Sequence, residues 1–140
     1  MTLEEFVNKA IGVPFVDKGR DYTGWDCHGL LRCAYMDVLG VELPSYTDAY
    51  RSTKDVTAIE EIFEHERTAN WMKVDKPAPM DGILLRLDNR PVHVGVVITH
   101  RDFLHTDRGI DTCVQEYTGL EWGLRVIGVF RLKPQSRMAS

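Results

Sequence analysis

The 140-residue sequence has no long hydrophobic run and no excess of positive charge. No stretch approaches the roughly 18 apolar residues of a membrane-spanning helix, so we expect no membrane insertion. Residues 1–12 begin with acidic side chains and lack the apolar centre of a secretion signal, which predicts synthesis in the cytoplasm without a signal peptide. The formal net charge of −4 argues against binding to nucleic acid.

Cysteine is also scarce. The three cysteines, Cys27, Cys33 and Cys113, include no Cys-x-x-Cys pair. An odd and sparse set is a poor disulfide framework and fits a reducing compartment. The missing pair removes the usual signature of a structural zinc site, so no metal and no cofactor are expected.

The remaining composition is that of an ordinary folded protein, with 44% hydrophobic and 27% charged residues. The length is close to the commonest size of one domain. No repeat or linker divides the chain, so we expect a single domain over residues 1–132. The polar tail, 133–140, is expected to be frayed.

Three helices are predicted in the first half of the chain. Thr2 and Glu5 form the pattern of a capping box for a helix over 3–11. Asp26 is a good N-cap for the clearest helix, whose apolar residues recur at helical spacing up to Gly40. A third helix is expected over 56–67.

Short aliphatic and β-branched segments separated by turn residues follow in the second half. Helices first and strands later predict an α+β domain, with N-terminal helices packed on a C-terminal antiparallel sheet of about five strands. The expected strands are 82–87, 93–98, 103–106, 112–116 and 125–130.

Cys27 falls in the first turn of the predicted helix. Unpaired backbone N–H groups and the helix dipole favour an anion there, and the thiolate is the reactive form of cysteine. Position alone does not distinguish this role from that of a small buried residue. Cys33 and Cys113 lack any local activating feature and are interpreted as structural.

A nucleophilic cysteine needs a base, and the base needs a partner that orients it. His65 lies in a charged helical stretch, and His100 lies in a turn between strands. His93 opens an apolar strand and His105 lies in the next one, so a hairpin can bring both rings beside the Cys27 helix. A histidine pair on a hairpin is equally compatible with a structural role.

Several motifs together resemble the NlpC-type cell-wall cysteine peptidases, a branch of the papain-like fold. The resemblance covers about residues 5–131, and His105 follows His93 by the twelve residues that are usual in that family. The matching segments, in chain order, are Gly-Val-Pro-Phe at 12–15, Trp-Asp-Cys-His-Gly-Leu-Leu at 25–31, Gly-Val-Glu-Leu-Pro at 40–44, Pro-Met-Asp-Gly at 79–82, His-Val-Gly-Val-Val at 93–97 and Phe-Leu-His-Thr at 103–106.

This resemblance implies a catalytic triad. Cys27 would attack a peptide carbonyl, His93 would act as general base, and His105 would orient the His93 ring. The implied activity is that of a cysteine endopeptidase or amidase that cleaves the stem peptides of peptidoglycan.

Three neighbouring positions are expected in the substrate or oxyanion region: Asp26, His28 and Phe15. Phe15 stands where the family usually has Tyr, so a hydroxyl near the nucleophile is lost. His28 stands where the family usually has Ser. Its ring would contact substrate, perturb the thiolate or be exposed to solvent, and exposure is the favoured interpretation.

Segment 19–24 resembles part of the peptidase domains of phage tail-tip assembly proteins. The absence of an export signal also fits such a protein. They predict a virion-associated wall hydrolase with tail-tip proteins as partners. Three alternatives stay open: a non-catalytic assembly or binding module on the same fold, a zinc site formed by Cys27, His93 and His105, and acyl transfer in place of hydrolysis.

Overall fold

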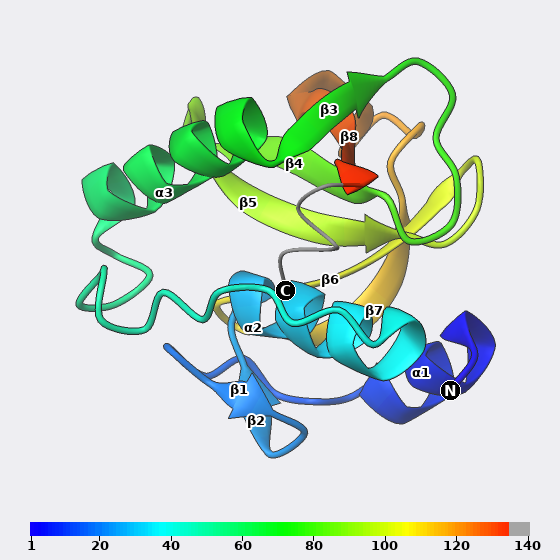
Figure 1. The fold of residues 1–140 in the computed structure, drawn as a ribbon, viewed down its shortest axis with the longest axis horizontal. Helices are drawn as coiled ribbons and strands as arrows, with labels where there is room; N and C mark the ends of the chain where they lie inside the picture. Colours follow the sequence, from blue (N-terminus) through cyan, green and yellow to red (C-terminus); the bar gives the residue numbers. More distant parts are fainter. Residues whose placement is uncertain (135–140) are drawn as a thin grey trace.

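The computed structural model describes residues 1–134. Two of the three described α-helices pack on one face of a six-stranded antiparallel sheet, and the N-terminal helix packs beside the end of the second (Figure 1). The expected α+β class is confirmed. The predicted tail lies mostly outside the described residues, and Lys133 donates its backbone N–H to Asn70 O at 2.8 Å.

The helices begin where the capping residues predict. α1 spans Leu3–Ala10, and its Thr2–Glu5 capping box is formed. α2 spans Cys27–Ala34 after the Asp26 N-cap and continues as a π-helical turn, η1, over Tyr35–Leu39. Gly40 ends this helix with φ 68°, a left-handed conformation that glycine adopts without strain. α3 spans Val56–Ala69, slightly longer than expected.

The sheet has one strand more than the five that were expected. Its order is β3-β8-β4-β5-β6-β7, and the additional strand, β3, pairs with β8 at one edge. β3 lacks a run of buried residues, because Met72 and Lys73 are exposed, which explains why hydrophobicity did not reveal it. The strands are β3 Trp71–Val74, β4 Gly82–Leu87, β5 Arg90–Val97, β6 Asp102–Asp107, β7 Ile110–Glu116 and β8 Val126–Leu132.

Two short strands, β1 (Arg20–Asp21) and β2 (Gly24–Trp25), form a hairpin just before α2. A 3-10 turn, η2, covers Gly123–Arg125. Among residues 1–134, no helix has the length and apolar character needed to cross a membrane.

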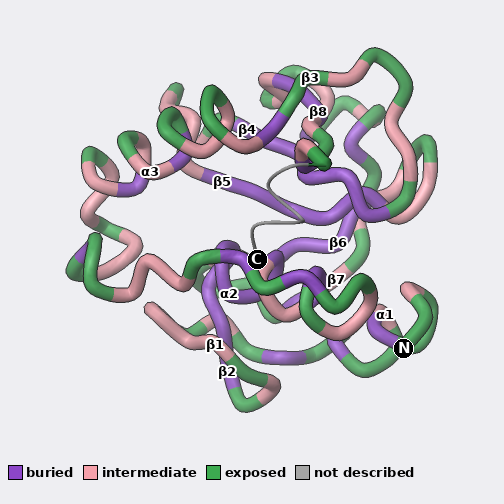
Figure 2. The backbone as a smooth tube through the Cα atoms, in the orientation of Figure 1, coloured by how far each residue is buried: buried purple, intermediate pink, exposed green. Residues whose placement is uncertain are grey.

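Apolar side chains pack on both faces of the sheet. β5 and β6 are buried along most of their length (Figure 2). The larger core lies between the helices and the sheet and includes Cys27, Leu30, Val94 and Val96. The smaller core lies on the other face, where the segment 117–125 provides the cover in place of a helix. Its buried residues are Ile83, Leu85, Val97, Phe103, Tyr117, Trp122 and Val129.

β5 and β6 approach each other closely next to the two predicted catalytic histidines. The strands pair only through Val96 with Leu104 and Val97 with Phe103. A Cβ atom added at Gly95 would lie 2.8 Å from both Leu104 O and Phe103 Cδ2, too close for any side chain. Glycine is therefore required at position 95 for these strands to meet.

Candidate active site

Cys27 is the first residue of α2 and lies where this helix meets β5. Its side chain is buried, with 9% of its surface exposed. The sulfur accepts a hydrogen bond from the backbone N–H of Val94, the residue that follows His93. The fold thus places the predicted nucleophile beside the peptide that carries the predicted base.

Burial raises the pKa of the Cys27 thiol to about 12, and the neighbouring Asp26 carboxylate acts in the same direction. The N-terminal end of α2 alone would lower the pKa of the Cys27 thiol. The Asp26 carboxylate partly offsets the helix dipole, because it lies at the same helix end and accepts the Gly29 N–H at 2.9 Å. In the resting protein the thiol is therefore protonated at neutral pH.

His93 and His105 are joined by a hydrogen bond between His93 Nε2 and His105 Nδ1 of 2.9 Å. Both rings are buried, with 1% and 0% of their surfaces exposed. Burial lowers the pKa of His93 to about 3, and the adjacent His105 adds to this effect. The pKa of His105 is also lowered, again mainly by burial. Both imidazoles are therefore neutral at pH 7, which is the form that a general base requires.

The structure brings the predicted histidine pair into contact, but not the thiol and its base. No hydrogen bond joins the Cys27 thiol to the His93 ring within residues 1–134. Catalytic hydrogen bonds in substrate-free enzymes are often long and form only when substrate is bound. In the resting state the Cys27 thiol and the His93 imidazole are both neutral.

Asp26 is the centre of a polar network at the start of α2. Only 1% of its surface is exposed. Besides Gly29, its carboxylate accepts from Arg20 Nη1 at 2.8 Å, from the Lys18 N–H at 3.0 Å and from the Tyr50 hydroxyl. Asp26 therefore ties the hairpin loop and the segment around Tyr50 to the helix start that carries Cys27.

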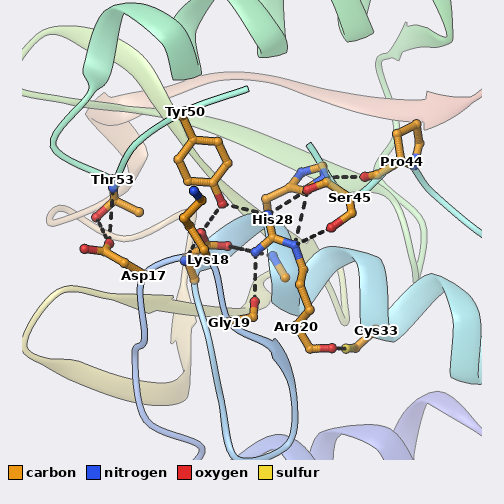
Figure 3. A network of polar contacts seen from close by, with 12 residues as sticks. Asp17, Lys18, Gly19, Arg20, His28, Cys33, Pro44, Ser45, Tyr50 and Thr53 are labelled. Atoms are coloured by element: carbon orange, nitrogen blue, oxygen red, sulfur yellow. Dashed lines mark hydrogen bonds and ion pairs between the residues drawn. The ribbon is translucent and has the colours of Figure 1, made fainter. Parts of the chain in front are cut away.

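Arg20 extends the same network toward the loop before α3 (Figure 3). Its Nη2 donates to Ser45 O at 2.7 Å and to the Tyr50 hydroxyl at 2.6 Å. Two segments far apart in the sequence are thus held together beside Cys27. A small pocket of about 10 Å³ is lined by both Tyr50 and Cys27.

His28 is buried, so the favoured expectation that it is exposed was wrong. Only 9% of its surface is accessible, because its ring packs against Tyr46 and Phe63. Its Nε2 donates to Pro44 O at 2.8 Å (Figure 3). Its Nδ1 is therefore an unprotonated acceptor, and it has no hydrogen-bond partner among the described residues.

His28 also connects the nucleophile to a second pocket. This pocket has a volume of about 60 Å³ and a mainly apolar lining between α2, α3 and the sheet. His28 and Val94 line it, and both adjoin Cys27, one in the sequence and the other through its N–H. His28 therefore lines both this pocket and the small pocket beside Cys27.

Phe15 lies beside the start of α2 through a bridge with Trp25. Its ring is covered by the guanidinium of Arg108, 5.4 Å from the ring centre. Arg108 also pairs with Asp17 at 2.9 Å. The aromatic position expected from the family pattern is thus retained and fixed by a cation, but without a hydroxyl.

The remaining cysteines and histidines lie outside the Cys27–His93 arrangement. The Cys33 thiol donates a hydrogen bond to Arg20 O, with 3.2 Å between sulfur and oxygen. Cys113 Sγ lies 4.0 Å from His105 Nε2. His65 is exposed on α3, and His100 is exposed in the turn after β5, as expected.

Two residues that were not predicted from the sequence enclose the histidine pair. The Trp122 ring stacks on His93 with 5.7 Å between centroids and meets His105 edge-on at 4.8 Å. Gln115 on β7 forms a hydrogen bond with His105 Nε2 through its side-chain oxygen. The alternation of β7 could have indicated Gln115, whereas nothing in the sequence pattern distinguishes Trp122 from a surface-loop residue.

Within residues 1–134, no group of three or more His, Cys, Asp or Glu side chains is placed to hold a metal ion. Cys27, His93 and His105 are not gathered as such a group.

Solved structures share this fold, whereas no curated protein matches the chain. The NlpC/P60 domain of the peptidoglycan hydrolase SagA is 19% identical with a TM-score of 0.60, covering 93% of this chain and 94% of that one. An NlpC/P60 family protein from Bacillus cereus is 18% identical with a TM-score of 0.64, covering 94% of this chain. A lipoprotein-like NLP/P60 family protein from Staphylococcus aureus is 22% identical with a TM-score of 0.62, covering 92%.

At these identities the structures demonstrate a common fold only. The chain spans 40% of the Bacillus cereus protein and 39% of the Staphylococcus aureus protein. The NlpC/P60 family model matches residues 12–131, which is most of the sequence. This chain therefore belongs to the NlpC/P60 family of cysteine peptidases, which are peptidoglycan hydrolases.

Proposed function

We propose that this protein cleaves peptide bonds in the stem peptides of peptidoglycan, with Cys27 as nucleophile, His93 as general base and His105 as the residue that orients His93. The observation that carries the proposal is the buried His93–His105 hydrogen bond next to the peptide that contacts the Cys27 sulfur.

The reaction begins with a neutral thiol and a neutral imidazole. As substrate binds, the Cys27 S–H bond breaks, its proton moves to His93, and the sulfur attacks the scissile carbonyl carbon. Backbone N–H groups in the first turn of α2 that do not bond Asp26 would stabilise the oxyanion. His93 then returns the proton to the leaving amine, and water hydrolyses the thioester.

The test is digestion of purified muropeptides of several wall chemotypes, with products identified by mass spectrometry. Wild type and Cys33→Ala should cut the same bond, whereas Cys27→Ala should leave it intact. If wild type cuts none of the chemotypes, the proposed activity is wrong. Added acceptor amines distinguish acyl transfer from hydrolysis, because only transfer yields the new amide.

A non-catalytic binding module is the second candidate. The raised pKa of the Cys27 thiol and the missing thiol–imidazole hydrogen bond favour it. The rate of Cys27 alkylation by iodoacetamide discriminates between the two. A working base makes this rate depend on His93, so His93→Ala slows alkylation in an enzyme and leaves it unchanged in a binding module.

The place of action that we propose is a phage tail tip, with tail proteins as partners. The support is the resemblance of segment 19–24, which forms most of the β1–β2 hairpin, to phage tail-tip peptidase domains. Mass spectrometry of purified virions tests it. A protein that is absent from virions and monomeric contradicts this placement without affecting the proposed chemistry.

A further inference from the structure

Gln115 lies on β7, the edge strand next to the strand that carries His105. Its cross-strand partner is Phe103, and His105 is the diagonal neighbour on the same face of the sheet. Its side-chain oxygen Oε1 forms a hydrogen bond with His105 Nε2. The two histidines and Gln115 thus form one continuous chain of hydrogen bonds.

The direction of each hydrogen bond follows from the amide oxygen, which only accepts. Because Gln115 Oε1 accepts, His105 Nε2 carries the proton, and Nδ1 of the neutral ring is left as an acceptor. His105 Nδ1 then accepts from His93 Nε2 over 2.9 Å. His93 consequently holds its proton on Nε2, and its Nδ1 is a free lone pair.

We propose, resting on the function proposed above, that Gln115 is a positioning residue, whose amide oxygen fixes the tautomers of His105 and His93 so that His93 presents an unprotonated Nδ1 to the Cys27 thiol. The proton from Cys27 is then taken up at Nδ1, and no other proton has to move. The imidazolium that results donates its Nε2–H to His105.

The opposite amide orientation would disable the base. With the Gln115 NH₂ group toward His105, that ring would carry its proton on Nδ1 and donate to His93 Nε2. His93 Nδ1 would then be protonated and unable to accept the thiol proton. One amide group therefore determines whether the resting site is competent.

The His105 ring stays neutral, because burial lowers its pKa by more than the nearby carboxylates of Asp107 and Glu121 raise it. Gln115 itself is only partly buried, on an edge strand. A substitution there should alter the hydrogen bond without disturbing the core.

Imidazole ¹⁵N chemical shifts measure the tautomers directly, in protein labelled at histidine. Wild type should show His93 and His105 both as Nε2–H tautomers. Gln115→Glu keeps an accepting oxygen and should preserve this pattern. Gln115→Met keeps the length but removes the acceptor, so His93 should shift toward a mixture of tautomers.

A wild-type spectrum with His93 protonated on Nδ1, or unchanged tautomers in Gln115→Met, would overturn the role of Gln115. This measurement needs no turnover, so it can fail or succeed independently of the hydrolase activity. On a muropeptide that wild type cleaves, kcat of Gln115→Met should fall roughly ten- to a hundredfold with KM unchanged, as for other partners that fix a histidine tautomer. Gln115→Glu should keep a kcat near that of wild type. Equal losses in both variants would also contradict the proposal.

Discussion

The buried His93 makes the folded protein sensitive to mild acid. An unfolded histidine has a pKa near 6.5, whereas burial lowers that of folded His93 to about 3. Between these values the unfolded chain binds a proton that the folded chain does not, so stability is present above pH 6.5 and is lost as pH falls. The loss is about 1.4 kcal/mol per pH unit from this one residue.

The window from pH 6.5 to 5 is the clearest for a measurement, because most carboxylates are still ionised there. His93 alone should remove about 2 kcal/mol of unfolding free energy across it, a large part of the roughly 5–15 kcal/mol of a typical domain. His28 and His105 act in the same direction, since burial lowers their pKa values too.

Urea unfolding followed by tryptophan fluorescence at several pH values provides the assay. His93→Gln should reduce the slope of stability against pH by about 1.4 kcal/mol per unit between pH 6 and 5. Val97→Ala is the control, since it removes a fully buried apolar side chain and should lower stability equally at every pH. An unchanged slope in His93→Gln would refute the buried, neutral state of this ring.

Three further substitutions test how the site is supported. Asp26→Ala removes the helix cap and the carboxylate paired with Arg20 at 2.8 Å, so urea unfolding should show a loss of about 3–5 kcal/mol; a loss below 1 kcal/mol would contradict it. Gly95→Ala forces a Cβ against the neighbouring strand, and thermal unfolding should reveal about 1–3 kcal/mol of destabilisation, whereas an unchanged midpoint would show that the strands can move apart. Trp122→Ala exposes the histidine pair to water, so the pKa of His93 measured by NMR titration should rise toward its ordinary value, and no rise would show that this ring does not shield it.

The fold was largely predictable because its elements carry local signals. The Thr2–Glu5 capping box, the Asp26 cap and the left-handed Gly40 each mark a helix end through chemistry that a few neighbouring residues determine. β3 escaped prediction because it is an edge strand with exposed residues, and its pairing with β8 depends on the assembled sheet.

The site was predictable in its main residues but not in its environment. The motifs around Cys27 and His93 identify the residue types that the chemistry needs. Burial is a property of the whole fold, so the exposed side chain expected at His28 and the lowered thiol pKa expected at Cys27 were not what the structure shows. Gln115 was not predicted because its contact with His105 joins two neighbouring strands and depends on their register.

Hydrolysis of peptidoglycan stem peptides through Cys27 can be measured as kcat/KM on one muropeptide that wild type cleaves, compared with Cys27→Ala and Cys33→Ala. We expect a loss of about a thousandfold or more for Cys27→Ala, and a change within about threefold for Cys33→Ala. Cleavage by Cys27→Ala at a rate near that of wild type would contradict it.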